Sequence, residues 1–420
     1  MIIHKFGGAA VKDAKGVRNL AAILNNRNES MVVVISAFGK TTNKLEELTS
    51  YIYSREETSF FHKLQELRSY HFQLISELFT EGHPVFLRIN EVFQELEHCY
   101  SKKSDSYDHL YDQVVSKGEI ISTLVIQSYL QDLGFACKWV DIRNKLITDN
   151  TYREATILWE QSHERIADMV DSSERLFITQ GFIAGDQEGF STTLGREGSD
   201  YTAAILGNML NAEEVIIWKD VPGVLNADPR YFEETKKLDR ISYREAIELA
   251  YYGAKIIHPK TIKPLQNKDI PLYVKSFLSP DSEGTIISQF ESYDTSIPVF
   301  IVKKDQMLIS ILPKDFSFIF EQQISNIYQL FAEQRVKVNL MQHSAITFTV
   351  AVDRESPKIE SLQDELKKNF RVLYNAGLEL ITVRHYTEEA LKNVLQGRKV
   401  LVEQRSRHTA QFILKDQTEQ

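Results

Sequence analysis

The chain has 420 residues, of which 43% are hydrophobic and 25% are charged, and its formal net charge is −9. This length suits two or three domains that each bury a core, and the composition is typical of a soluble globular protein. The acidic balance argues against general nucleic-acid binding, which needs a concentrated basic face. No apolar run approaches the roughly 18 residues of a membrane span, so we expect neither a nucleic acid nor a membrane as partner.

Cysteine usage bears on the compartment. The two cysteines, Cys99 and Cys137, form neither a metal-binding pattern nor a disulfide framework, which fits a reducing environment. The segment from Met1 to Lys5 is too short for the apolar region of a secretory signal. We therefore expect a cytoplasmic protein.

The first fifty residues contain two rounds of strand, small-residue turn and helix. Strands are predicted at 2–6 and 31–35, a helix over about 13–25, and the second turn over 36–43. This order is typical of an α/β nucleotide-type core. Neither turn matches the P-loop or the dinucleotide-binding pattern, which argues against both of those enzyme classes.

Lys5 stands at the end of the first predicted strand, just before Gly7 and Gly8. It is either an edge lysine that shields the strand or a cation directed at phosphate oxygens. The sequence around it leaves both interpretations open.

The segment from about 50 to 115 has the apolar spacing of helices and is interpreted as a helical insertion, whose aromatic residues indicate core packing. Another helix is predicted from 116 to about 133, followed by a strand at 136–140. Glu119 falls in the first turn of that helix, where the dipole favours a carboxylate by about 0.3–1 kcal/mol. Its position therefore has a structural explanation as well as a functional one.

The stretch from 176 to 230 organises the chain. Apolar runs at 176–182 and 215–218 predict buried strands on either side of a helix at 201–210. In such a parallel unit, the loops at the carboxyl ends of the strands are where open α/β sheets bind ligands.

The loop Thr192–Asp200 contains Gly195 and Gly198 and ends where the helix begins. It could bind an anion through its backbone and the helix dipole. Alternatively, Ser199 or Asp200 simply caps the helix, and for this loop alone the cap is favoured by roughly two to one.

Farther along, we predict a helix at 242–252 and the last strand of the sheet at 272–277. The pattern gives an α/β domain over 1–280 with an open, mainly parallel sheet sandwiched by helices, a linker over 281–296, and two βαββ rounds over 297–420. The elements predicted in these rounds are strands at 307–312, 336–342, 345–352, 371–376, 378–385, 398–404 and 409–414, and helices at 320–334, 358–369 and 387–395.

Six motifs, in order and at the right spacings, resemble those of aspartate kinases, which lie within the wider amino-acid kinase family. The match covers about 1–280, and the last region resembles the paired ACT domains of those enzymes. The insertion is similar to one that separates aspartate kinases from acetylglutamate, glutamate 5- and uridylate kinases. The motifs are Lys5-Phe6-Gly7-Gly8, Ser36-Ala37 with Thr42-Asn43, Lys117-Gly118-Glu119, Thr192 to Asp200, Asp220-Val221-Pro222-Gly223 with Ala227-Asp228-Pro229-Arg230, and Gly253 to Pro259.

The resemblance implies ATP-dependent phosphorylation of the side-chain carboxylate of L-aspartate to 4-phospho-L-aspartate, the first step of lysine, threonine and methionine biosynthesis. A carboxylate with a pKa near 3.9 is already ionised at neutral pH, so this nucleophile needs no general base. Catalysis then depends on positioning and on neutralising charge. ATP would carry Mg²⁺ mainly on its phosphate oxygens, and we expect no protein residue as metal ligand.

The resemblance also implies roles for individual residues. Asp200 would orient the catalytic lysines, Arg196 would bind a substrate carboxylate, and Glu119 would face the substrate ammonium. The assigned sets are Lys5, Asp200 and Lys255 for catalysis; Ser36, Thr42, Glu119, Arg196 and Ser199 for aspartate; and Lys5, Gly7, Gly8, Lys219, Asp220, Arg230, Lys255 and Ile256 for ATP.

Several positions depart from the family pattern. Ala9-Ala10 replaces Thr-Ser, Glu197 replaces a glycine, Lys219 replaces a threonine, and Leu225-Asn226 replaces Tyr-Thr. Lys219 would compensate the new charge of Glu197, and loss of the tyrosine bears on ATP affinity more than on chemistry.

Two alternatives remain. One is another carboxylate kinase of the same superfamily, acting on glutamate or a similar acid. The other is an amino-acid-binding regulatory protein that has lost catalysis, which Ala9, Ala10 and Glu197 would favour.

The resemblance to ACT pairs implies an amino-acid effector held between subunits, and hence a homodimer or a larger homo-oligomer. Asn339 stands where lysine-sensitive relatives often carry Asp, and an amide does not balance an ammonium charge. The second module also lacks the final helix expected after 409–414 and is interpreted as truncated. We expect weak or absent inhibition by lysine, with threonine or no effector instead.

Overall fold

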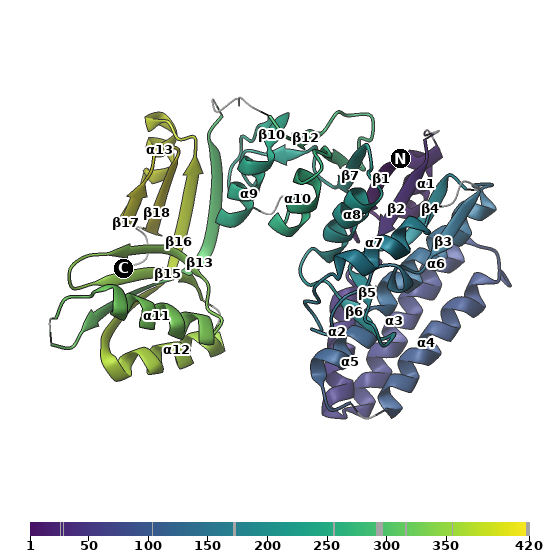
Figure 1. Cartoon of the computed structure of the whole chain (residues 1–420), viewed down its shortest axis with the longest axis horizontal. Coiled ribbons are helices and arrows are strands. Elements are labelled where there is room, and N and C mark those ends of the chain that lie inside the picture. Colours follow the sequence, from purple (N-terminus) through teal and green to yellow (C-terminus); the bar gives the residue numbers. More distant parts are fainter. Residues whose placement is uncertain are drawn as a thin grey trace. The chain divides into compact units, whose positions relative to one another are not determined.

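The computed structural model divides the chain into two compact units, which are described separately (Figure 1). The first comprises Met1–Val224, Lys237–Ile247 and Ile256–Glu291, and the second comprises Leu225–Lys236, Glu248–Lys255 and Ser292–Gln420. The residues that the structure describes are 1–25, 27, 29–102, 104–170, 174–254, 257–290, 297–315, 317–354 and 356–416.

The first unit is built on an eight-stranded sheet of order β10-β12-β11-β7-β1-β2-β4-β3. All neighbouring strands are parallel except β11 and β12, so the predicted open, mainly parallel sheet is confirmed. The strands are β1 (Ile2–Phe6), β2 (Met31–Ile35), β3 (Cys137–Val140), β4 (Leu176–Gln180), β7 (Glu214–Lys219), β10 (Arg240–Ser242), β11 (Leu272–Ser276) and β12 (Thr285–Ser288).

The central strands are buried along their whole length, as expected for parallel strands covered on both faces. Their register aligns Phe6 with Ile35 on one side and with Trp218 on the other, and Ile35 with Gln180. The carboxyl ends of β1, β2, β4 and β7 are therefore level, and the residues that follow them meet at one edge of the sheet.

Helices pack on this sheet, with α8 against β1 and β7 and α6 against β3 and β4. Helices α3 to α5 occupy the segment from 50 to 115, where the apolar spacing predicts helices, and Figure 1 shows α3 and α4 side by side. The helices are α1 (Ala14–Asn25), α2 (Thr41–Ser54), α3 (Glu57–Leu78), α4 (Val85–Ser101), α5 (Tyr107–Val115), α6 (Lys117–Asp132), η1 (Ile142–Asn144), α7 (Trp159–Ala167), α8 (Gly198–Met209), α9 (Tyr243–Tyr252) and α10 (Pro259–Gln266).

The structure differs from the sequence prediction at several short elements. Between the predicted strand at 176–182 and the predicted helix at 201–210, where no strand is predicted, lies a hairpin of β5 (Ile183–Gly185) and β6 (Ser191–Thr193). The strand over 272–277 is not the last of the sheet, since β12 follows it inside the predicted linker. Strands of three or four residues are too short for periodicity to reveal.

Two further comparisons concern the same region. Helix α10 is absent from the prediction, although it begins at a proline, a residue favoured in a first helical turn. Positions 291–296 of the predicted linker lie outside the described residues.

The second unit contains a six-stranded sheet of order β14-β15-β13-β16-β18-β17, antiparallel throughout. Helices α11 and α12 follow β13 and β15, and α13 follows β16. The bounds are β13 (Val299–Pro313), α11 (Glu321–Glu333), β14 (Val338–His343), β15 (Phe348–Asp353), α12 (Ser356–Asn369), β16 (Phe370–Arg384), α13 (Glu388–Leu395), β17 (Arg398–Arg405) and β18 (Thr409–Asp416); a short pair, β8 (Val224–Leu225) and β9 (Lys237–Leu238), lies earlier in the chain.

Two long strands connect the halves of this sheet. The separate strands predicted at 371–376 and 378–385 are one strand, β16, and β13 begins earlier than the predicted 307. Register shifts around Gln306 divide each strand into two pairing segments, which explains why the pattern suggests separate strands.

Each half has its own core. Ile309, Ile311 and Phe331 belong to a buried cluster that α11 and α12 share. Val383 and Leu391 belong to another, which includes α13. This α+β arrangement agrees with two ACT-like modules.

Candidate active site

Five chemically active side chains of the first unit come from the carboxyl edge of the sheet or from helices that begin there. Lys5 lies near the end of β1, Ser36 directly follows β2, and Lys219 ends β7. Asp200 lies in the first turn of α8 and Glu119 in the first turn of α6. This is the edge where parallel α/β sheets bind ligands.

Asp200 is held between two ammonium groups. Its Oδ1 lies 2.6 Å from Lys5 Nζ and its Oδ2 lies 3.9 Å from Lys219 Nζ, and its side chain is only 5% exposed. Burial would raise the pKa of this carboxyl, but Lys5 and Lys219 outweigh it and hold the pKa below the ordinary value. Asp200 is therefore an anion that fixes two cations, and Lys5 and Asp200, both predicted site residues, are in contact.

Glu119 is a buried carboxyl in a different environment. Its Oε1 accepts a hydrogen bond from the N–H of Ala37 at 3.1 Å, whereas its Oε2 is buried and has no hydrogen-bond partner among the described residues. Burial raises the pKa to about 8, against the lowering effects of the backbone hydrogen bonds and of Lys5. The unpartnered oxygen is suited to a cationic donor that is absent from the free protein.

The two glycines after β1 are required for different reasons. A Cβ on Gly8 would lie 2.7 Å from the carbonyl oxygen of Gly39 and 2.8 Å from that of Ala37, so only glycine fits there. A Cβ on Gly7 would lie 3.3 Å from Lys5 Nζ. Gly8 thus allows two backbone segments to pack closely, whereas Gly7 leaves Lys5 Nζ uncovered by a side chain at this position.

Ser36 and Ser199 meet across the edge of the sheet, since Ser36 Oγ donates to Ser199 Oγ at 2.9 Å. A Cβ on Gly181 would lie 2.5 Å from that of Ser199, so a glycine after β4 allows this approach. Neither Ser199 nor Asp200 is the N-cap of α8, because that position belongs to Glu197. The alternative in which these two residues merely cap the helix is wrong.

Glu197 adopts a left-handed backbone conformation, with φ of +55°. This conformation costs a non-glycine residue about 1–2 kcal/mol, which accounts for the glycine usual at this position. The neighbouring Arg196 is exposed, and within the described ranges no ion pair engages its guanidinium. Arg196 is thus available to an anionic ligand.

The remaining predicted site residues are Thr42, Asp220, Arg230, Lys255 and Ile256. Thr42 is half-buried in the first turn of α2, and Asp220 is exposed just after β7. Arg230 belongs to the second unit, where its guanidinium pairs with Asp228 at 2.5 Å. Lys255 and Ile256 lie outside the described residues.

The backbone N–H of Ala37 is a site component that the sequence does not assign. It fixes Glu119, and it can do so because a small residue follows Ser36 where the chain leaves β2. A Cβ on Gly118 would lie 2.9 Å from the Cβ of Ala37, so the two small residues allow α6 to approach this turn. The Ser36-Ala37 and Lys117-Gly118-Glu119 motifs therefore meet in space.

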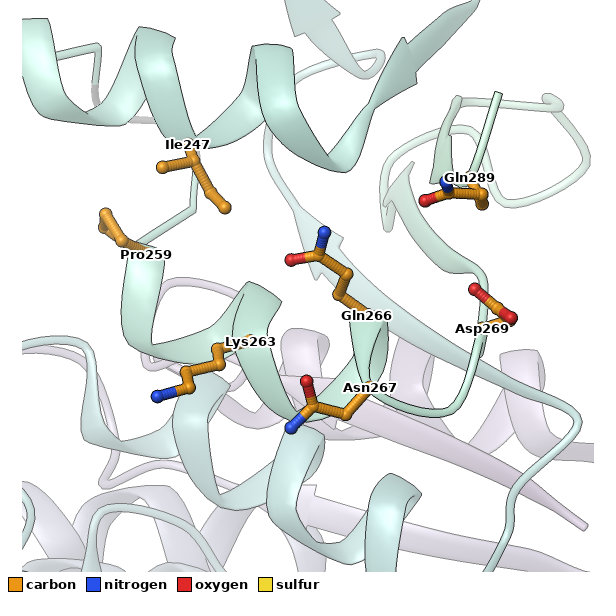
Figure 2. Close-up of a pocket in the computed structure, with 7 residues that line it drawn as sticks. All are labelled: Ile247, Pro259, Lys263, Gln266, Asn267, Asp269 and Gln289. Atoms are coloured by element: carbon orange, nitrogen blue, oxygen red, sulfur yellow. The ribbon is translucent and has the colours of Figure 1, made fainter. Parts of the chain in front are cut away.

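An open pocket lies elsewhere in the first unit, beside α9 and α10 (Figure 2). Among the described residues, none that is predicted to bind aspartate or ATP lines it. The lining side chains are those of Ile247, Pro259, Lys263, Gln266, Asn267, Asp269 and Gln289. In the part of the chain that the structure describes, no three His, Cys, Asp or Glu side chains are grouped to hold a metal ion, and no helix is long and apolar enough to cross a membrane.

Comparison with known proteins identifies the family. The family model described as the amino acid kinase family matches residues 1–276. This chain belongs to that family. Lysine-sensitive aspartokinase 3 of Escherichia coli (strain K12) is 29% identical over an alignment of 401 residues that covers 91% of this chain and 86% of that protein.

Solved structures of family members agree with the whole fold. E. coli aspartokinase III in complex with aspartate and ADP superposes with a TM-score of 0.82 at 27% identity, over 99% of this chain and 96% of that one. The same enzyme in complex with lysine and aspartate gives 0.82 at 28% identity, over 98% and 95%. The likeness therefore includes both the kinase-type sheet and the ACT-like region.

The pKa of Glu119 predicts how stability depends on pH. The carboxyl has a pKa of about 8 in the folded protein and an ordinary value near 4.5 in the unfolded chain. Between these two pH values the Glu119 carboxyl is ionised in the unfolded chain but protonated in the folded protein. The free energy of unfolding should therefore fall as pH rises through this window. The stability that the protonated Glu119 carboxyl contributes is fully present below about pH 4.5 and is lost above about pH 8.

Urea unfolding of the wild type and of Glu119→Gln, without ligands at several pH values, measures this contribution. The stability of the variant relative to the wild type should increase from pH 5 to pH 8 and then level off. A difference that stays constant over this range would show that Glu119 is ionised throughout.

Proposed function

We propose that this chain is an aspartate kinase, which transfers the γ-phosphoryl group of ATP to the side-chain carboxylate of L-aspartate. The products are 4-phospho-L-aspartate and ADP. The extended similarity to aspartokinase 3 and to aspartokinase III with aspartate and ADP bound supports this activity. The observation that carries the proposal in this chain is the cluster of Lys5 and Lys219 around the buried carboxylate of Asp200.

In this mechanism the cluster supplies positive charge to the transferring group. Asp200 does not need to accept a proton, because the side chain of the substrate aspartate is already ionised at neutral pH. Lys5 and Lys219 also hold Asp200 itself as an anion. It orients Lys5 and Lys219 toward the phosphate oxygens, whose charge must be neutralised as two anions approach each other. The N–H groups at Gly7 and Gly8 would add hydrogen bonds at the same turn.

The substrate amino acid would be held by its charges. Glu119 would accept the ammonium through its unpartnered oxygen, and binding would then release the proton that the free enzyme keeps there below about pH 8. Arg196 would bind a carboxylate with its planar fork. Ser36, Thr42 and Ser199 would add neutral hydrogen bonds.

ATP would bind through Lys219 and Asp220 at the end of β7, and the resemblance assigns Arg230, Lys255 and Ile256 to the same ligand. We propose that Mg²⁺ enters with ATP and is held mainly by phosphate oxygens. The donor set of the described site fits this, since Asp200 is occupied by two ammonium groups. A bound Mg²⁺ would neutralise phosphate charge, while the chain's own residues position the two substrates.

A hydroxamate trap of the acyl phosphate tests the proposal against its two alternatives. With ATP and Mg²⁺, the purified chain should form hydroxamate with aspartate and little with glutamate. A preference for glutamate would identify another carboxylate kinase. No product with either acid, from a protein that still binds aspartate, would identify a regulatory protein.

For regulation, we propose an amino-acid effector at the ACT-like region and, because such a site would lie between subunits, a homodimer or larger homo-oligomer. The relative is named lysine-sensitive, and its structure with lysine is known. In this chain the Asn339 side-chain oxygen already accepts a hydrogen bond from Lys303 Nζ at 2.8 Å. An internal ammonium thus uses the acceptor that a lysine effector would need.

Titration of activity against lysine and threonine tests this proposal, with the molar mass followed by light scattering. Lysine should inhibit weakly or not at all, and threonine is the better candidate. Half-inhibition by lysine at sub-millimolar concentration, which corresponds to more than about 4 kcal/mol of binding, would contradict it. A monomeric mass would contradict the oligomer.

We also propose a cytoplasmic location. Cys99 and Cys137 are both free, which suits a reducing compartment.

A further inference from the structure

The outer edge of β6 has no neighbouring strand among the described residues and is completed by two side chains of α5 and one backbone N–H. On one side β6 pairs with β5. On the other side, Gln113 donates to the carbonyl oxygen of Ser191 at 2.8 Å and accepts from its N–H at 3.1 Å. The N–H of Thr193 donates to Asp112, and its carbonyl oxygen accepts from Ala155 at 2.9 Å. Helix α5 and the loop at 149–157 therefore fix the strand that leads into the substrate loop.

Asp112 is the most constrained group in this arrangement. The residue is fully buried, and it accepts the N–H of Thr193 at 2.9 Å, the hydroxyl of Thr193 at 2.7 Å and the N–H of Arg153 at 3.1 Å. The Arg153 guanidinium contacts Glu46 and the ring of Tyr111. The Asp112 carboxylate is thus held chiefly by directed hydrogen bonds to neighbouring loops.

A buried carboxylate is costly unless hydrogen bonds satisfy it, and it is a poor device for stability alone. Burial raises the pKa of Asp112 to about 6, against the lowering effects of the bonds from Arg153 and Thr193. Its acceptor-only oxygens, however, define the positions of three donors closely. The geometry is that of a group that holds segments in register.

The segments that Asp112 joins are those that carry the substrate-binding residues. Helix α5 continues directly into α6 and Glu119, whereas Thr193 lies just before Gly195 and Arg196. Arg153 packs against the same loop, since a Cβ on Gly195 would lie 3.4 Å from the carbonyl oxygen of Arg153.

We propose that Asp112 is a positioning residue, which fixes the Arg196 loop relative to Glu119 and so sets the separation between the groups that bind the carboxylate and the ammonium of the amino acid. This inference rests on the proposed function, because it assigns those roles to Arg196 and Glu119. Asp112 itself would not touch the substrate. Its loss should therefore weaken amino-acid binding more than it slows phosphoryl transfer.

The substitution Asp112→Asn keeps the shape but turns one acceptor into a donor that faces N–H and O–H donors. The aspartate KM should rise about tenfold, since a buried hydrogen-bond network loses a partner. The kcat and the KM for ATP should stay within about twofold of wild type. The control is Asp132→Asn, the same exchange at a half-exposed carboxylate at the end of α6, which should change none of these three constants.

If Asp112→Asn does not fold, Thr193→Val removes only the hydroxyl donor and should raise the aspartate KM about threefold, the loss expected for one modest hydrogen bond. Thermal unfolding of each variant shows which ones are folded. An unchanged aspartate KM in a folded variant, whether or not kcat falls, would overturn the positioning role.

The two proposals fail in different ways. If the wild type forms no aspartyl phosphate, the proposed function fails. Calorimetric titration of aspartate and of glutamate into wild type and Asp112→Asn then decides the positioning role without turnover. Weaker binding by the variant of whichever acid the wild type binds supports the role, whereas equal binding, or no binding of either acid by the wild type, overturns it.

Discussion

The contact between Lys5 and Asp200 is the interaction on which the rest of the site depends. It joins the end of β1 to the first turn of α8, and Lys219 brings the end of β7 to the same carboxylate. Removing one partner from a buried ion pair is costly because the other charge is left uncompensated. The register of β1 and β7 in the sheet is what places both lysines at one anion.

The pKa values of two buried carboxyls at this edge are shifted in opposite directions. The pKa of Asp200 is lowered because two ammonium groups lie beside it, and that of Glu119 is raised because it is buried with one oxygen unpartnered. The difference separates their proposed tasks. Asp200 already has its cations in the free protein, whereas Glu119, in the proposed mechanism, pairs with a cation only when the substrate ammonium binds.

Much of the fold could be predicted from the sequence because its long elements have strong periodicity. The buried runs of β1, β2, β4 and β7 and the long helices α3 and α4 are examples. The hairpin β5–β6 and strand β12 could not, since three or four residues carry too little pattern. Likewise, β16 is one strand, but the shift in its register with β13 interrupts the alternating pattern, so the sequence suggests two strands.

The motifs, through their resemblance to a family, indicated which residues to examine, but not how they are arranged. Nothing local shows that Lys5 touches Asp200, that Glu119 is fully buried, or that Glu197 has a positive φ. Asp112 gives the clearest case, because an aspartate in a helical insertion has no visible partner until β6 is placed beside it. Such contacts depend on tertiary structure, which a local pattern does not contain.

The central claim is that Asp200 acts by orienting lysines and does not accept a proton. Turnover of Lys5→Ala, Asp200→Asn and the double variant, with ATP and aspartate saturating, tests it most directly. If Asp200 works through Lys5, the double variant should have nearly the same kcat as Lys5→Ala, apart from a small further loss through Lys219, since coupled residues are not additive. Losses that multiply in full would contradict the claim, because Asp200 would then have a separate role in catalysis.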